Sequence, residues 1–198
     1  MIKLNKQDFL LVVDPQNDFV TGSLAVKGAK PMLPSIKLYT DMFLKIKQDG
    51  KYNIGISFDM HPAVHCSFTQ WPPHCVIGTW GAQIVDELAS SYLLAMSLPI
   101  YKGTNISEDA YSPFQNTGLS DYLRTIEAKR LFVCGIATDY CVKAAVESAT
   151  KYKHFDGETF VLIDAIAAVN VQLGDGALAL NEMAGLGAKL IAMDGFCE

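Results

Sequence analysis

The sequence lacks an apolar run long enough to cross a membrane. A spanning helix needs roughly 18 or more apolar residues in succession, and charged or polar residues interrupt every apolar stretch before that length. The first apolar stretch is brief and ends at Asp14, which is typical of a buried strand and not of a signal peptide. We therefore expect no membrane partner and a cytoplasmic location.

An excess of positive charge and a framework of paired cysteines are also missing. The net charge is −5 at neutral pH, opposite in sign to the surface that binds nucleic acid, so we expect no nucleic-acid partner. The five cysteines are odd in number and include no Cys-x-x-Cys pair. This pattern argues against a disulfide framework or a four-cysteine zinc site, and it favours a reducing compartment.

Short apolar runs alternate with longer amphipathic stretches along the 198 residues, which we expect to form a single domain, 1–198. Continuous apolar runs are typical of strands covered on both faces of a parallel sheet. The pattern predicts an α/β fold of three layers, a predominantly parallel six-stranded sheet with helices on both faces. The expected strands are 9–14, 53–59, 98–102, 130–135, 159–164 and 188–194, and the expected helices are 31–50, 81–90, 119–127, 139–152 and 174–184.

Chemically active residues follow several of these strands. Asp14 ends the first strand, Asp59 ends the second, Lys102 ends the third, and the fourth leads through a turn to Cys141. Ligands in such folds bind beyond the carboxyl ends of the strands. We therefore expect these four residues to meet at one edge of the sheet.

Cys141 lies where a helix is expected to begin, with Thr138 as a candidate N-cap. The positive end of a helix favours a thiolate, and its backbone N–H groups could hold an oxyanion. A small apolar side chain packed under the helix would suit the same position. Cys134, in the middle of a strand, is expected to belong to the core.

A cysteine nucleophile needs a proton acceptor. Asp14 could serve if it lies in a dry pocket beside a cation, and Lys102 offers that cation. Taken singly, Asp14 could instead form a turn before Pro15, and Lys102 could be a solvated surface residue. Their placement at the ends of two predicted core strands favours the catalytic interpretation.

The segment that follows the second strand predicts a metal site. Asp59 and His61 are two residues apart on an extended chain, so their side chains share one face. His74, in WPPHC, offers a third ligand, and three protein ligands leave positions open for water or substrate. His65 could be a further ligand, although a role in supporting the ligands is favoured. An Asp or His in this position could also simply cap a helix.

Five ordered motifs resemble the nicotinamidase (pyrazinamidase) branch of the isochorismatase-like cysteine hydrolases. They are VVDPQNDF, SFDMHPAVHCSF, WPPHCVIGTWGA, YKGT and GIATDYCV, and they span most of the chain. The resemblance implies the catalytic set Asp14, Lys102 and Cys141, and the metal ligands Asp59, His61 and His74.

The same resemblance implies further parts of a site. Phe19 and Trp71 match an aromatic pair that sandwiches a pyridine ring, and Tyr111 is expected to line the pocket. Ala137, after a cis peptide bond, matches the residue whose N–H joins that of Cys141 in an oxyanion hole.

The resemblance therefore implies a metal-dependent amidohydrolase that converts nicotinamide to nicotinate and ammonia through a cysteine thioester, and that also accepts pyrazinamide. One divalent ion is expected, with zinc favoured and iron or manganese also compatible with two histidines and a carboxylate. A homo-oligomer is possible. The alternatives are an amidase of the same superfamily acting on a ureido or carbamoyl substrate, and a catalytically silent protein that binds a pyridine ligand.

Overall fold

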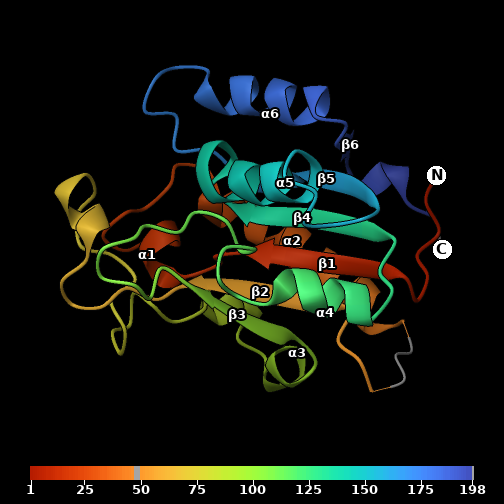
Figure 1. The fold of residues 1–198 in the computed structure, drawn as a ribbon, viewed down its shortest axis with the longest axis horizontal. Helices are drawn as coiled ribbons and strands as arrows, with labels where there is room; N and C mark the ends of the chain where they lie inside the picture. Colours follow the sequence, from red (N-terminus) through yellow and green to blue (C-terminus); the bar gives the residue numbers. More distant parts are fainter. Residues whose placement is uncertain (47–49, 198) are drawn as a thin grey trace.

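The computed structural model describes residues 1–46 and 50–197. In these residues six strands form one parallel sheet in the order β3-β2-β1-β4-β5-β6 (Figure 1), as the sequence predicted. The strands are β1 (Asp8–Val13), β2 (Ile54–Asp59), β3 (Leu98–Lys102), β4 (Arg130–Ile136), β5 (Glu158–Ala167) and β6 (Lys189–Ile191). The α-helices are α1 (Asn17–Val20), α2 (Ala29–Leu44), α3 (Ser91–Ala95), α4 (Leu119–Thr125), α5 (Lys143–Thr150) and α6 (Asp175–Gly185).

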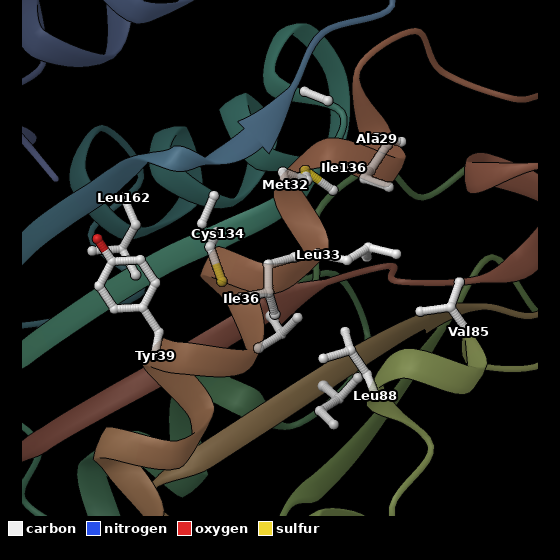
Figure 2. Packing of buried hydrophobic residues seen from close by; sticks show 14 of the residues in the cluster. Ala29, Met32, Leu33, Ile36, Tyr39, Val85, Leu88, Cys134, Ile136 and Leu162 are labelled. Atoms are coloured by element: carbon white, nitrogen blue, oxygen red, sulfur yellow. The ribbon is translucent and has the colours of Figure 1, made fainter. Parts of the chain in front are cut away.

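Helices cover both faces of the sheet. Successive strand residues point to opposite sides, so each face carries apolar side chains that pack against its own helices. Leu10 and Val12 of β1 pack in a core cluster with residues of α2, while Phe9, Leu11 and Val13 pack in a second cluster with α4, α5 and α6. Figure 2 shows the first cluster, in which Ile36 and Tyr39 of α2 lie against Cys134 of β4. Cys134 is fully buried there, as expected. Each large apolar side chain buried in this way contributes about 1.5–3 kcal/mol.

The direction of strand order reverses at the pairing of β1 with β4. From β1 the chain adds β2 and then β3 on one side, and it returns to place β4 on the other side. Gly135 allows this close pairing, because its φ is 114° and a Cβ there would lie 2.1 Å from the carbonyl oxygen of Val13. The carboxyl ends of β1, β2, β3 and β4 therefore share one edge of the sheet, where ligands bind in folds of this kind.

The helix predicted over residues 81–90 is wrong. Only Asp86–Leu88 forms a single 3-10 turn, and α3 begins later, where the Ser90 hydroxyl accepts the N–H of Leu93. Residues 81–85 instead hydrogen-bond to the segment that follows β1: Gly81 and Gln83 accept N–H groups from Asp18 and Asn17. Those long-range bonds hold the backbone away from a helix.

Two other helix predictions need correction at their ends. The helix predicted over 31–50 begins earlier, at Ala29, and ends at Leu44; residues 47–49 of that prediction lie outside the described residues. Thr138 is not an N-cap: Ala137 precedes the helical segment, which opens with a π-helical turn, η3 (Thr138–Val142), before α5. Among the described residues, no helix has the length and apolar character needed to cross a membrane.

Candidate active site

Asp14, Lys102 and Cys141 meet beyond the strand ends, as the sequence predicted. The Lys102 ammonium lies 2.9 Å from Asp14 Oδ2 and 3.5 Å from Cys141 Sγ. A carboxylate oxygen of Asp14 lies within 4.8 Å of the same sulfur. All three residues are buried, so their interactions are little screened by water. The arrangement places a carboxylate and a cation beside one thiol.

Burial and the charge of Lys102 shift the pKa values of Asp14 and Cys141 in opposite directions. Burial raises the pKa of Asp14, and Lys102 only partly opposes it. Burial also raises the pKa of the Cys141 thiol well above its ordinary value, again against the effect of Lys102. Burial alone would lower the pKa of Lys102, but Asp14 and Asp59 outweigh it and raise this pKa. A single ammonium thus lies beside two carboxylates and a thiol, and burial favours the protonated form of the thiol.

Ser57 fixes the orientation of Asp14. Its hydroxyl donates to Asp14 Oδ1 at 2.6 Å, while the other carboxylate oxygen faces Lys102. Asp14 has φ 47°, so the chain turns sharply at the end of β1. Sequence reasoning assigned no role to Ser57, which lies 43 residues away along the chain.

The π-helical turn η3, which follows β4, carries Cys141. The peptide bond between Ile136 and Ala137 is cis, as predicted. The carbonyl of Ala137 then accepts N–H groups from Tyr140 and Val142 at 3.0 Å each. These bonds close the turn that presents the Cys141 side chain to the cluster.

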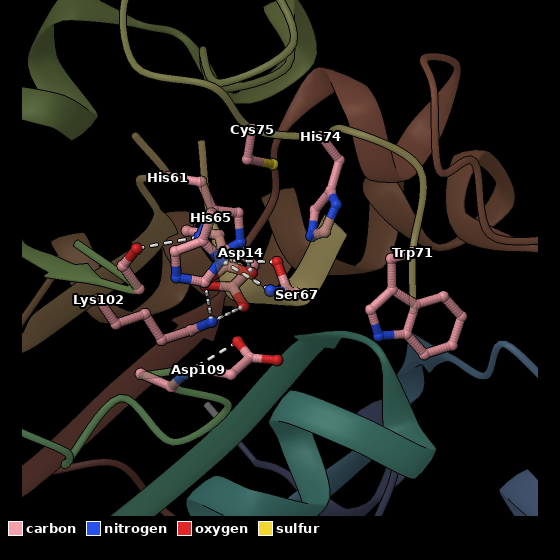
Figure 3. A network of polar contacts seen from close by, with 12 residues as sticks. Asp14, His61, His65, Ser67, Trp71, His74, Cys75, Lys102 and Asp109 are labelled. Carbon is pink, nitrogen blue, oxygen red and sulfur yellow. Dashed lines mark hydrogen bonds and ion pairs between the residues drawn. The ribbon is translucent and has the colours of Figure 1, made fainter. Parts of the chain in front are cut away.

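Asp59, His61 and His74 offer ligand atoms that lie within 4.8 Å of one another, all buried. His61 Nδ1 lies 3.0 Å from the Gly103 carbonyl and His74 Nδ1 lies 2.8 Å from the Pro72 carbonyl, so each ring directs its Nε2 elsewhere. His61 Nε2 is buried without a hydrogen-bond partner, 3.6 Å from Asp59 Oδ2. A buried nitrogen without a partner costs free energy, and a metal ion would satisfy it. The residues therefore fit a divalent ion. Figure 3 shows the rings of His61 and His74, whose centroids are 4.8 Å apart.

The charge states of Asp59 and His74 suit a bound cation. Burial alone would raise the pKa of Asp59, but Lys102 and His61 outweigh it and hold this pKa below its usual range. Burial alone would lower the pKa of His61, but Asp59 outweighs it and raises this pKa. Burial lowers the pKa of His74. Asp59 thus stays anionic, and His74 favours the neutral imidazole that metals bind.

His65 packs against His61 but is not one of the three candidate ligands Asp59, His61 and His74. Its ring stacks on that of His61 with centroids 4.1 Å apart, and its Nδ1 lies 2.7 Å from the Ser67 hydroxyl. Together with Asp109, it forms a separate cluster around His61 whose ligand atoms also lie within 4.8 Å of one another. His65 is therefore positioned to support His61.

An apolar pocket opens above Cys141. Phe19, Trp71 and Tyr111 line it, as expected, and Trp71 Nε1 donates to the Tyr111 hydroxyl at 3.2 Å. Asp59, His74, Ala137 and Cys141 reach the same pocket from the site below. Sequence reasoning missed six further lining residues, Leu24, Val26, Asp109, Ile136, Tyr140 and Val169. Of these, Tyr140 could have been found from the sequence, because it directly precedes Cys141. Its ring meets that of Trp71 edge-on, with centroids 5.2 Å apart.

The fold and the cluster at its edge define a three-layer α/β protein with a buried thiol between a carboxylate and an ammonium. The chain belongs to the isochorismatase domain family, whose model matches residues 8–194.

Individual relatives are similar over nearly the whole chain. Nicotinamidase of Escherichia coli (strain K12) is 35% identical, over 93% of this chain and 94% of its own length. The crystal structure of pyrazinamidase of Pyrococcus horikoshii in complex with zinc has a TM-score of 0.82 and 34% identity, covering 94% of this chain and 99% of that one. PnC1 from L. infantum, in complex with nicotinate, has a TM-score of 0.84 and 30% identity, covering 99% and 98%.

Proposed function

We propose that this protein hydrolyses nicotinamide to nicotinate and ammonia through a thioester on Cys141, and that it accepts pyrazinamide as a second substrate. The observation that carries the proposal is the position of the Cys141 thiol, 3.5 Å from the Lys102 ammonium and at the base of an aromatic pocket. The names of the relatives support the same substrate class.

In the first half of the reaction Asp14 accepts the proton of the Cys141 thiol, and the sulfur attacks the carboxamide carbon. Asp14 then gives this proton to the amide nitrogen, the carbon–nitrogen bond breaks, and ammonia leaves a thioester behind. The raised pKa of Asp14 suits this role, because a carboxyl that both accepts and returns a proton works best near the operating pH.

In the second half Asp14 takes a proton from water, and the resulting hydroxide attacks the thioester carbon. The carbon–sulfur bond breaks, Asp14 returns the proton to the Cys141 sulfur, and the carboxylic acid that forms loses its proton to solvent and leaves as nicotinate. Lys102 keeps the Asp14 carboxylate oriented, and its positive charge stabilises the negative charge that develops on the Cys141 sulfur. The N–H groups of Ala137 and Cys141 are the proposed donors to the oxyanion, an interaction that commonly contributes about 2.7–4 kcal/mol.

Phe19, Trp71 and Tyr111 are the proposed ring-binding residues. Asp59, His61 and His74 would hold one divalent ion, for which we propose zinc. When bound, the ion supplies a Lewis acid for the pyridine ring nitrogen, which orients the ring and draws electron density from the carboxamide. Because the proposed nucleophile is a free thiol among five unpaired cysteines, we propose a reducing compartment, the cytoplasm, as its setting.

Two alternative functions, an amidase for a ureido or carbamoyl substrate and a silent protein that binds a pyridine ligand, would each leave part of this site without a use. A ureido or carbamoyl substrate has no need for an aromatic pocket lined by Phe19, Trp71 and Tyr111. A silent protein that only binds a pyridine ligand has no need for a buried thiol beside a carboxylate and an ammonium.

Ammonia release from nicotinamide by the wild type, by Cys141→Ala and by Cys134→Ala tests the proposal. We expect Cys141→Ala to lose turnover and keep nicotinamide binding, because the thiol does the chemistry while the pocket holds the ring. Cys134→Ala, a buried thiol away from the site, should lose about 1 kcal/mol of stability and keep its activity per folded molecule. Ammonia release by Cys141→Ala at the wild-type rate would exclude the thioester, and the absence of release by the wild type would favour a binding protein.

A further inference from the structure

We infer that Asp18 is a positioning residue that holds the proposed metal ligand His74 in place through the backbone on both sides of it. This inference rests on the proposed role of His74. Asp18 lies in α1, directly before Phe19, and it is buried.

The Asp18 carboxylate bonds to backbone N–H groups of two separate segments. Its Oδ2 accepts the N–H of Cys75, the residue after His74, at 2.7 Å. Its Oδ1 accepts the N–H of Ser23 at 3.0 Å, and the Ser23 hydroxyl donates in turn to the carbonyl of Pro73, the residue before His74, at 2.8 Å. Both backbone neighbours of His74 are therefore tied to one carboxylate, directly on one side and through Ser23 on the other.

The segment that carries His74 needs such support. Cys75 has φ 47°, a conformation that non-glycine residues rarely adopt. Figure 3 shows Trp71, His74 and Cys75 along one irregular segment of the chain. A hydrogen bond to a carboxylate is about twice as strong as one between neutral groups. The Asp18–Cys75 bond thus stabilises a backbone turn that sets the direction of the neighbouring imidazole.

Glycines leave room for the carboxylate on two sides. A Cβ at Gly81 would lie 1.9 Å from Asp18 Oδ2, and a Cβ at Gly22 would lie 2.3 Å from Oδ1. Gly81 also accepts the Asp18 N–H at 3.0 Å. The enclosed position of Asp18 means that the carboxylate cannot be moved without displacing Cys75, Ser23 or the Gly81 backbone.

The test measures the affinity of the protein for zinc alone, by competition with a chromophoric chelator. Asp18→Asn keeps the shape of the side chain but places an amide donor opposite one of the two N–H groups. We expect it to bind zinc about 10-fold or more weakly, which is the usual effect of losing a group that orients a metal ligand. Gly81→Ala should do the same by displacing the carboxylate, and the double variant should be little worse than either single one. At a zinc concentration that fills the wild type but only part of the variant, KM for nicotinamide should rise more than kcat falls.

Two variants serve as matched controls. Asp164 also accepts two hydrogen bonds, from the Tyr39 hydroxyl and the Met193 N–H, but it lies away from His74, so Asp164→Asn should leave zinc affinity unchanged. Gly185→Ala in α6 meets nothing within 4 Å and should also bind zinc as the wild type does. If Asp18→Asn does not fold, Ser23→Ala carries the test, because it removes only the exposed bond to Pro73 and should weaken zinc binding less severely.

The outcomes separate this inference from the proposed function. Zinc binding by Asp18→Asn equal to that of Asp164→Asn, or additive losses in the double variant with Gly81→Ala, would overturn the positioning role alone. Zinc binding by His74→Ala equal to that of the wild type would overturn the ligand assignment, and the positioning role with it.

Discussion

Asp14 and Lys102 face each other without solvent exposure, with 2.9 Å between Oδ2 and Nζ. The ammonium also donates to Asp59 Oδ1 at 2.6 Å, so one cation links the proposed base to a proposed metal ligand. Taking such charges out of water is unfavourable, and each one depends on its partner to remain in the core.

Lys102→Met should therefore lower the free energy of unfolding by about 3–5 kcal/mol, because it leaves buried carboxylates without a cation. Urea unfolding in the presence of a chelator measures this loss, and ammonia release should fall with it. Adding Asp14→Asn should recover part of the stability, since one of the uncompensated charges is then removed.

Lys37 provides the matched control for that experiment. It pairs with Asp41 at 2.8 Å on the exposed surface of α2, where such pairs contribute about 0–1 kcal/mol. Lys37→Met should unfold much as the wild type does. If Lys37→Met and Lys102→Met lost the same free energy of unfolding, burial of the Lys102–Asp14 pair would have no energetic consequence.

The protonation of Cys141 gives a second prediction. Burial raises the pKa of this thiol despite Lys102. A group with a raised pKa stays protonated until the pH exceeds that value, so the unliganded enzyme should carry a neutral thiol at physiological pH. The ultraviolet thiolate absorbance of the wild type minus that of Cys141→Ala should show no step between about pH 6 and 9. A step near neutrality would show instead that the cation and the helix end outweigh burial.

Removal of the metal gives a third prediction. Chelation should raise KM for nicotinamide, and the advantage of nicotinamide over benzamide, which lacks the ring nitrogen, should shrink. His61→Ala should mimic chelation because it removes a proposed ligand. His65→Ala should have a smaller effect, since His65 stacks on His61 and lies in a separate cluster. Active enzyme without stoichiometric metal, and a rate untouched by chelators, would point to a metal-free member of the family.

The two tryptophans allow a fourth prediction. Trp71 lines the pocket, whereas Trp80 is 56% exposed. Trp71→Ala should raise KM for nicotinamide about 10-fold, equivalent to about 1.4 kcal/mol of lost ring contact. Trp80→Phe should leave KM unchanged and make Trp71 the single indole, whose fluorescence nicotinamide should then alter. Unchanged KM in Trp71→Ala would place the ring elsewhere in the pocket.

The sequence predicted the sheet and its active edge because both depend on local patterns. Continuous apolar runs marked β1, β2 and β3, and the residue that closes each run is close to the site. The joint placement of Asp14 and Lys102 at two strand ends thus indicated the site, although each residue taken singly also suited a turn or a solvated surface position. The meeting of a carboxylate, an ammonium and a thiol at one edge follows from the parallel arrangement of the strands.

The remaining features depend on contacts between distant parts of the chain. Ser57 hydrogen-bonds to Asp14 from 43 residues away along the chain, and Asp18 hydrogen-bonds to Cys75 from 57 residues away. Neither contact produces a local pattern in the sequence. Residues 81–85 have a helical pattern but hydrogen-bond to the segment after β1. The expected stabilisation of a Cys141 thiolate considered the helix end and not the burial that opposes it.

The positions of the site residues along the chain also set the order in which they are synthesised. Asp14 directly follows β1, Asp59 and Lys102 end β2 and β3, and Cys141 follows β4, which pairs with β1 in the middle of the sheet. A ribosome extends the chain from its N-terminus at about 5–20 residues per second. The Cys141 sulfur is therefore synthesised after the carboxylate and ammonium that surround it in the folded protein.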